Sequence, residues 1–179
     1  IVAAWFLAKC PKFPVRLDSL VVDPVLADSC KGYNKSISPS DLWSPPPLGF
    51  FKVNVNGAVN RDWKSSGIGG ILRDEKNKVL GSFSISSGPG PPGLAELKAI
   101  QTGIGFFMES EWEGKGRLII ESDSAIAVNW IKNTGDCPVL FFQLVRKIVN
   151  SVLERNIIIR FVKRGVNWEA DRLAKKGIG

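Results

Sequence analysis

The stretch FKVNVNGAVN, residues 51–60, sets the reading of the rest of the chain. Within it, Val53 and Val55 alternate with Asn54 and Asn56. Successive side chains of a β-strand point to opposite faces, so the alternation predicts a strand with one apolar face and one amide-bearing face. Such a strand is either an ordinary edge strand or an active-site strand in which an amide has replaced a carboxylate.

The pattern that follows predicts a mixed sheet. Two apolar runs around a polar turn at Asp74 to Lys78 indicate a hairpin, and apolar residues at helical spacing then alternate with short buried runs. Strands joined by tight turns should be antiparallel, and strands that follow helices should be parallel. We therefore predict an α/β fold, a five-stranded mixed sheet flanked by helices. Its expected strands are 49–58, the hairpin 67–86, 116–124 and 157–162, and its expected helices are 94–110, 124–133, 137–156 and 167–177.

A proline-rich segment, SPPPLG at residues 44–49, indicates a linker of polyproline type. We place the domain boundary there, with an irregular extension over 1–44 and a folded domain over 45–179. The chain begins at Ile1, not Met, and we expect it to be part of a longer gene product. Its first apolar run, IVAAWFLA, has eight residues, too few to span a bilayer, and we expect no membrane association.

Composition narrows the chemistry. The 179 residues carry a net charge of +7, and from Arg155 onward seven basic side chains stand against two acidic ones. A concentrated basic charge suits a polyanion such as nucleic acid, although a basic surface without a partner is the alternative. The chain has no histidine, which excludes histidine-based triads, zinc sites and general acid–base catalysis. The three cysteines lie far apart, without metal or disulfide spacing, and indicate an intracellular setting.

Three short acidic motifs lie in or next to the predicted helices and strands. AEL places Glu96 in the first turn of the first helix, ESDS places Asp123 at the end of the fourth strand, and NWEAD places Asp171 in the last helix. Each has a structural explanation: a favourable charge at a helix N-terminus, an N-cap supplied by Ser122 or Asp123, and a helix-surface pair with Lys175. Together they suggest a magnesium site, because Mg²⁺ prefers carboxylate oxygens and two-metal phosphoryl transfer needs several of them.

The chain from about Trp43 to Gly177 resembles the plant ribonuclease H-like domains related to non-LTR retrotransposons. The matching pieces occur in family order, and they read WSPPPLGFFKVNVNGA, GIGGILRDEKNKVLG, LAELKAI, ESDSAIAV and VNWEADRLAKKG. The resemblance implies the ribonuclease H fold and endonucleolytic cleavage of the RNA strand of an RNA–DNA hybrid. It assigns Glu96, Asp123 and Asp171 as three of four catalytic, metal-binding carboxylates. The fourth, the Asp of a D-G-A motif, is replaced by Asn56 in NGA.

Other departures from the family pattern are the missing histidine and Gly165, which stands where an acid is common. We therefore expect weak binding of Mg²⁺ or Mn²⁺, weakened or lost hydrolysis, and retained binding of nucleic acid, either RNA–DNA hybrid or double-stranded RNA. The alternatives are an active hybrid ribonuclease that uses three carboxylates and a non-catalytic protein-interaction module built on residues 1–44. We expect a monomer that contacts nucleic acid through Lys163, Arg164, Asn167, Lys175 and Lys176.

Overall fold

Strand β1, Phe50–Val59, is the central strand of a five-stranded sheet in the computed structural model, which describes residues 43–178. The strand order is β3-β2-β1-β4-β5, with antiparallel pairing on the β2 side of β1 and parallel pairing on the β4 side. The predicted mixed sheet is confirmed, and the edge-strand reading of residues 51–60 is wrong because β1 has a neighbour on both sides. The other strands are β2 Ser66–Arg73, β3 Val79–Ser86, β4 Arg117–Ser122 and β5 Ile158–Phe161.

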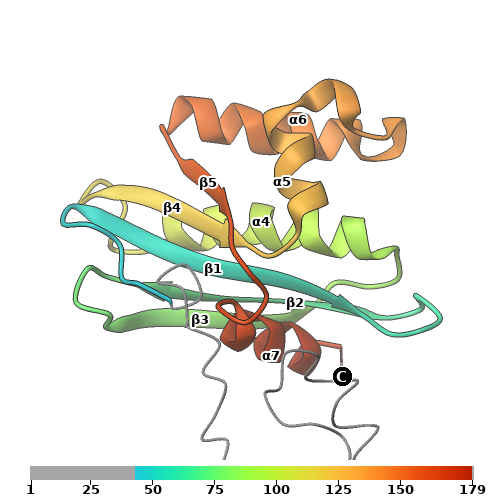
Figure 1. Cartoon of the computed structure of the whole chain (residues 1–179), viewed down its shortest axis with the longest axis horizontal. Helices are drawn as coiled ribbons and strands as arrows, with labels where there is room; N and C mark the ends of the chain where they lie inside the picture. Colours follow the sequence, from blue (N-terminus) through green and yellow to red (C-terminus); the bar gives the residue numbers. More distant parts are fainter. Residues whose placement is uncertain (1–42, 179) are drawn as a thin grey trace, which may run out of the picture. The chain divides into compact units, whose positions relative to one another are not determined.

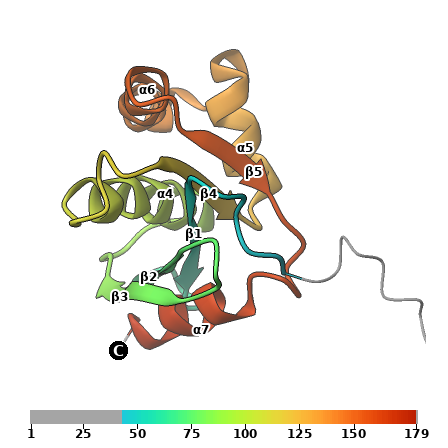
Figure 2. The same cartoon turned by 90° about the vertical axis from the view of Figure 1, so that its left-hand side faces the viewer.

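Helices cover both faces of this sheet (Figure 1). Figures 1 and 2 show α7 on one face, with α4, α5 and α6 on the other. The helices are α4 Pro92–Met108, α5 Ala125–Lys132, α6 Val139–Glu154 and α7 Trp168–Lys176, with a short 3-10 turn η2 at Thr134–Asp136. This arrangement of strands and helices is that of the ribonuclease H-like α/β fold.

The two faces of β1 separate its valines from its asparagines. Val53 and Val55 are fully buried toward α4, where a side chain added at Gly103 would collide with Val55 and touch Val53. Asn54 and Asn56 reach the opposite face and bond to residues at the start of α7. The alternation read from the sequence therefore corresponds to an apolar face under one helix and a polar face under another.

Glycines let α4 and α7 approach the sheet very closely. A Cβ on Gly57 would lie 2.4 Å from the backbone carbonyl carbon of Ala95 on α4. On the other face, Cβ atoms on Gly67 and Gly69 would lie 2.2 and 2.3 Å from backbone atoms of Ala174 on α7. These glycines thus serve helix–sheet packing, and the close contacts bring the helix-borne carboxylates to β1.

Two helix starts differ from the predictions. Helix α4 begins at Pro92, so Glu96 lies in its second turn, and the first-turn assignment is wrong. Proline is favoured in the first turn, where its missing N–H costs no hydrogen bond. The cap of α5 is Ser124, whose Oγ accepts a hydrogen bond from the Ala127 N–H, and neither Ser122 nor Asp123 fills that role. Asp123 is therefore not needed to start the helix.

Of the extension predicted over residues 1–44, residues 1–42 lie outside the described residues. Within residues 43–178, no helix has the length and apolar character needed to cross a membrane. The prolines that precede β1 do lie in the described part, and the carbonyl of Pro47 accepts a hydrogen bond from the Phe50 N–H.

Candidate active site

Asn56 lies where the polar face of β1 meets α7. Its side chain is almost fully buried, at 1% exposure. Its Nδ2 donates a hydrogen bond of 3.2 Å to Oδ1 of Asp171. The predicted proximity of residues 56 and 171 is thus present, with the amide N–H and not the amide oxygen facing the carboxylate.

Glu96 approaches the same strand from α4. Its Oε2 accepts a hydrogen bond of 3.1 Å from the backbone N–H of Gly57, the residue after Asn56. Burial raises the pKa of Glu96 to about 8, and the neighbouring charges of Asp123 and Asp171 act in the same direction. At neutral pH the Glu96 carboxyl therefore keeps its proton.

Asp123 follows the end of β4, and its side chain is only 6% exposed. Burial raises its pKa, while the guanidinium of Arg164 and a hydrogen bond from Asn167 oppose that effect. The Arg164 Nε lies 3.7 Å from Oδ2 of Asp123. The carboxyls of Glu96, Asp123 and Asp171 thus gather at one end of the central strands, since each of the other two acts on the pKa of Glu96.

Asp171 combines two roles that the sequence left as alternatives. Its Oδ2 forms the predicted i,i+4 pair with Lys175, at 2.6 Å from Nζ. Its Oδ1 accepts from buried Asn56. The surface pair therefore exists, but it does not remove Asp171 from the site, because one carboxylate serves both partners.

Asn54 is the centre of a buried network that the sequence did not reveal. Its Nδ2 donates to Oε2 of Glu121 at 3.1 Å and to Oδ1 of Asn167 at 3.2 Å. Asn167 in turn donates to the Val55 carbonyl at 2.9 Å. The Glu121 carboxylate also pairs with buried Lys52 at 2.9 Å. The sequence feature that could have indicated this network is the period-two spacing, which puts residues 52, 54 and 56 on one face of the strand.

The donor set has the chemistry of a hard-cation site but not its geometry. Carboxylate and amide oxygens are suitable ligands for Mg²⁺. Among residues 43–178, however, no group of three or more acidic or cysteine side chains is arranged to hold a metal ion. Asp171 is already engaged by Lys175 and Asn56. As they stand, these residues do not fit a pair of divalent ions.

The five residues expected to contact nucleic acid divide into two groups. The side chains of Lys163, Arg164, Lys175 and Lys176 are exposed, whereas Asn167 is 1% exposed and bound within the network under the carboxyls.

Exposed aromatic residues in the same region were not predicted. Trp168, the first residue of α7, is 56% exposed and lies under the guanidinium of Arg172, 5.8 Å from its ring centroid. Phe161 at the end of β5 is 50% exposed. Aromatic rings among cations are typical of surfaces that bind nucleic acid.

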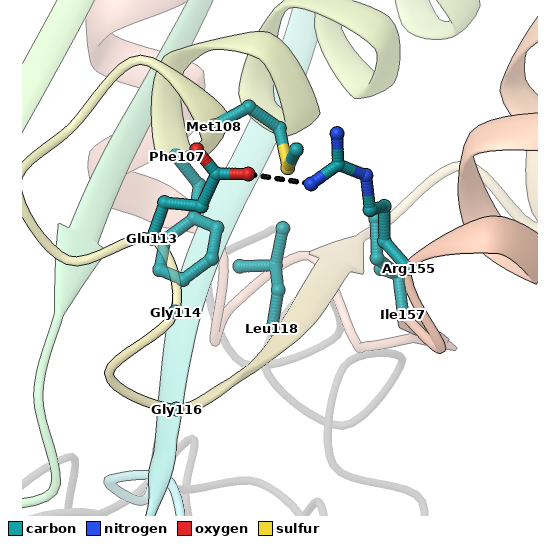
Figure 3. A pocket seen from close by; sticks show the side chains of 8 residues that line it. All are labelled: Phe107, Met108, Glu113, Gly114, Gly116, Leu118, Arg155 and Ile157. Atoms are coloured by element: carbon teal, nitrogen blue, oxygen red, sulfur yellow. Dashed lines mark hydrogen bonds and ion pairs between the residues drawn. The ribbon is translucent and has the colours of Figure 1, made fainter.

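A cavity of about 390 Å³ lies elsewhere in the molecule. Figure 3 shows Leu118 at its floor and an ion pair between Glu113 and Arg155 across it. Leu118 belongs to the first residues of β4, whereas Asp123 follows the last, so the cavity is at the opposite end of that strand. The cavity is therefore separate from the carboxyl site.

Comparison with known proteins agrees with this fold. A family model described as "Reverse transcriptase-like" matches residues 54–177. A protein of Arabidopsis thaliana named "Putative ribonuclease H protein" is 34% identical over 134 residues, which cover 74% of this chain and 20% of that protein. The chain thus spans about a fifth of the length of this relative.

Solved structures of ribonucleases H share the fold. LC11-RNase H1, isolated from compost by a metagenomic approach, superposes with a TM-score of 0.66 at 21% identity, over 73% of this chain and 96% of that one. LC11-RNase H1 in complex with an RNA/DNA hybrid gives a TM-score of 0.62 at 22% identity, over 72% and 96%. With a family model that covers most of the folded residues and a sheet of the same architecture, the chain belongs to the Reverse transcriptase-like family and forms a ribonuclease H-like domain.

Proposed function

We propose that this domain binds nucleic acid, with an RNA–DNA hybrid as its substrate class, and that its hydrolysis of the RNA strand is weak or lost. The fold is shared with LC11-RNase H1, which has been solved in complex with such a hybrid. The exposed cations and Trp168 beside the carboxyls suit a phosphate backbone. The weakness of catalysis follows from residue 56.

The hydrogen bond from Asn56 to Asp171 carries the proposal. It commits the amide N–H to Asp171, one of the carboxylates that a metal site here would need as a ligand. An aspartate at residue 56 would add a negative charge and a second anionic oxygen. At about 4 Å and an effective dielectric constant of about 20, one such charge is worth about 4 kcal/mol toward a monovalent cation. The loss corresponds to on the order of a thousandfold in cation affinity.

The test is cleavage of a labelled RNA–DNA hybrid by the natural chain and by Asn56→Asp, in Mg²⁺ and in Mn²⁺. We expect Asn56→Asp to cleave faster, and any activity of the natural chain to appear first in Mn²⁺, which binds nitrogen and oxygen ligands more tightly. Asn60→Asp, which adds the same charge just after β1, is the matched control and should change nothing.

A double variant, Asn56→Asp with Asp123→Asn, separates restored activity from a contaminating nuclease and should be inactive. Equal rates for the natural chain and Asn56→Asp in Mg²⁺ would contradict the proposal. The domain would then be an active hybrid ribonuclease for which three carboxylates suffice.

Binding is tested separately by the salt dependence of hybrid affinity. Removal of one cation that binds a phosphate should lower the slope of log affinity against log salt by about 0.9, as for duplex DNA. Neutralising the four exposed cations of the site should therefore flatten the slope markedly. A set of exposed lysines elsewhere is the control: Lys76, Lys115, Lys132 and Lys147. Equal slopes for the two sets would refute the assignment of the binding surface.

A further inference from the structure

The segment that leads into β1 packs against the polar face of the sheet through Trp43. The indole Nε1 of Trp43 donates a hydrogen bond of 2.8 Å to Oδ1 of Asn54. One residue later, the Ser44 carbonyl accepts a hydrogen bond of 2.6 Å from Nζ of Lys52. Pro46 is buried. These contacts join the predicted boundary region directly to the network beneath the carboxyls.

The ring of Trp43 also contacts two cations, each paired with an acid. Lys52 Nζ and the Arg73 guanidinium carbon both lie 5.0 Å from the ring centroid. Lys52 pairs with Glu121 on β4, and Arg73 on β2 pairs with Glu169 on α7. One side chain therefore touches residues that connect three strands and the helix that carries Asp171.

The hydrogen bond to Asn54 determines how that amide is oriented. With Oδ1 held by Trp43, Nδ2 faces Glu121 and Asn167. Asn167 must then accept through its oxygen, which leaves its N–H groups for the Val55 carbonyl and for the carboxylate of Asp123. The chain of hydrogen bonds runs from the indole to an acidic side chain of the site.

We propose that Trp43 is a positioning residue of the site, which holds the Asn54–Asn167 network and the start of α7 in place. It precedes residues 54–177, the part matched by the family model, and no comparison assigns it a role. This role of Trp43 concerns the site without nucleic acid, so it can be tested independently of the proposed hydrolysis.

The test is Trp43→Phe, which keeps an aromatic ring beside the two cations but removes the N–H donor. The readout is the side-chain amide signals of Asn54 and Asn167 in ¹⁵N–¹H NMR spectra of the ¹⁵N-labelled chain. We expect both pairs of signals to shift or broaden. Trp112→Phe is the matched control, because Trp112 packs on Phe51 on the apolar face of β1, opposite the face that carries Asn54, and should leave both pairs in place.

A second variant tests the branch through Arg73 should Trp43→Phe fail to fold. Glu169→Ala removes the acceptor of the Arg73 guanidinium and should move the Asn167 signals while Asn54 stays bound to Glu121. The inference is overturned if Trp43→Phe leaves both asparagines unchanged or moves them no more than Trp112→Phe does. Unmoved Asn167 signals in Glu169→Ala would likewise overturn the link to α7.

Discussion

Glu96→Gln should make the domain more stable at alkaline pH and flatten the dependence of its stability on pH. The pKa of Glu96 is raised from 4.5 to about 8 by burial and then by the charge of Asp123. The folded state therefore holds a proton that the unfolded chain releases between those pH values. Stability is fully present below about pH 4.5 and falls as pH rises through about 8. Glutamine stays neutral throughout.

The magnitude follows from the two pKa values. Each tenfold change in proton affinity is worth about 1.4 kcal/mol, so the interval from 4.5 to about 8 corresponds to at most about 5 kcal/mol. Partial contact of Glu96 with solvent lowers this figure, and we expect about 2–4 kcal/mol. The hydrogen bond from the Gly57 N–H should survive, because the glutamine oxygen can accept it.

The assay is urea unfolding at pH 5 and pH 8.5, which yields the free energy of unfolding of each variant. The difference between Glu96→Gln and the natural chain should be small at pH 5 and large at pH 8.5. Glu154→Gln, at an exposed glutamate of α6, is the control and should follow the natural chain at both values. Parallel pH profiles for Glu96→Gln and the natural chain would refute the electrostatic description of the site.

Two further predictions concern packing and binding. Gly57→Ala should destabilise the domain by about 1–3 kcal/mol or more in urea unfolding, because its Cβ would meet the α4 backbone at 2.4 Å. Gly105→Ala lies on α4 itself, with nothing within 4 Å of the added Cβ, and should be neutral or stabilising; equal effects would contradict the close-approach argument. Trp168→Ala should weaken hybrid binding by about fivefold to a hundredfold in fluorescence anisotropy, the range for removing one aromatic ring that stacks on a base. Leu140→Ala, at an 81% exposed residue of α6, should leave the affinity unchanged, and the same affinity for both variants would exclude Trp168 from the interface.

The structure explains how β1 can carry two amides on one face. Both asparagines are buried on the face of β1 that packs against α7, where an unpaired amide would be costly. Asn56 is satisfied by a carboxylate of the site, and Asn54 by the network that Trp43 completes. An asparagine at residue 56 is thus compatible with a well-bonded interior, which agrees with the proposal that the fold persists while cation binding weakens.

Local patterns in the sequence were sufficient for the order and type of the elements. The hairpin of β2 and β3 follows from its polar turn, where the Asp74 side chain accepts hydrogen bonds from the backbone N–H groups of Lys76 and Lys78. The apolar spacing from Leu97 to Phe107 predicted α4, and both of these residues are buried. Such signals are short-range, since periodicity and turn chemistry act over a few residues.

The resemblance to ribonucleases H named the acidic residues, and the tertiary structure decided what each one touches. Asn56 and Asp171 are 115 residues apart in the chain, and Asn54 and Glu121 are 67 apart. No local rule states which way a buried amide turns or which of two partners a carboxylate takes. Those choices depend on how closely α4 and α7 approach β1, and only the folded packing of the backbone sets that distance.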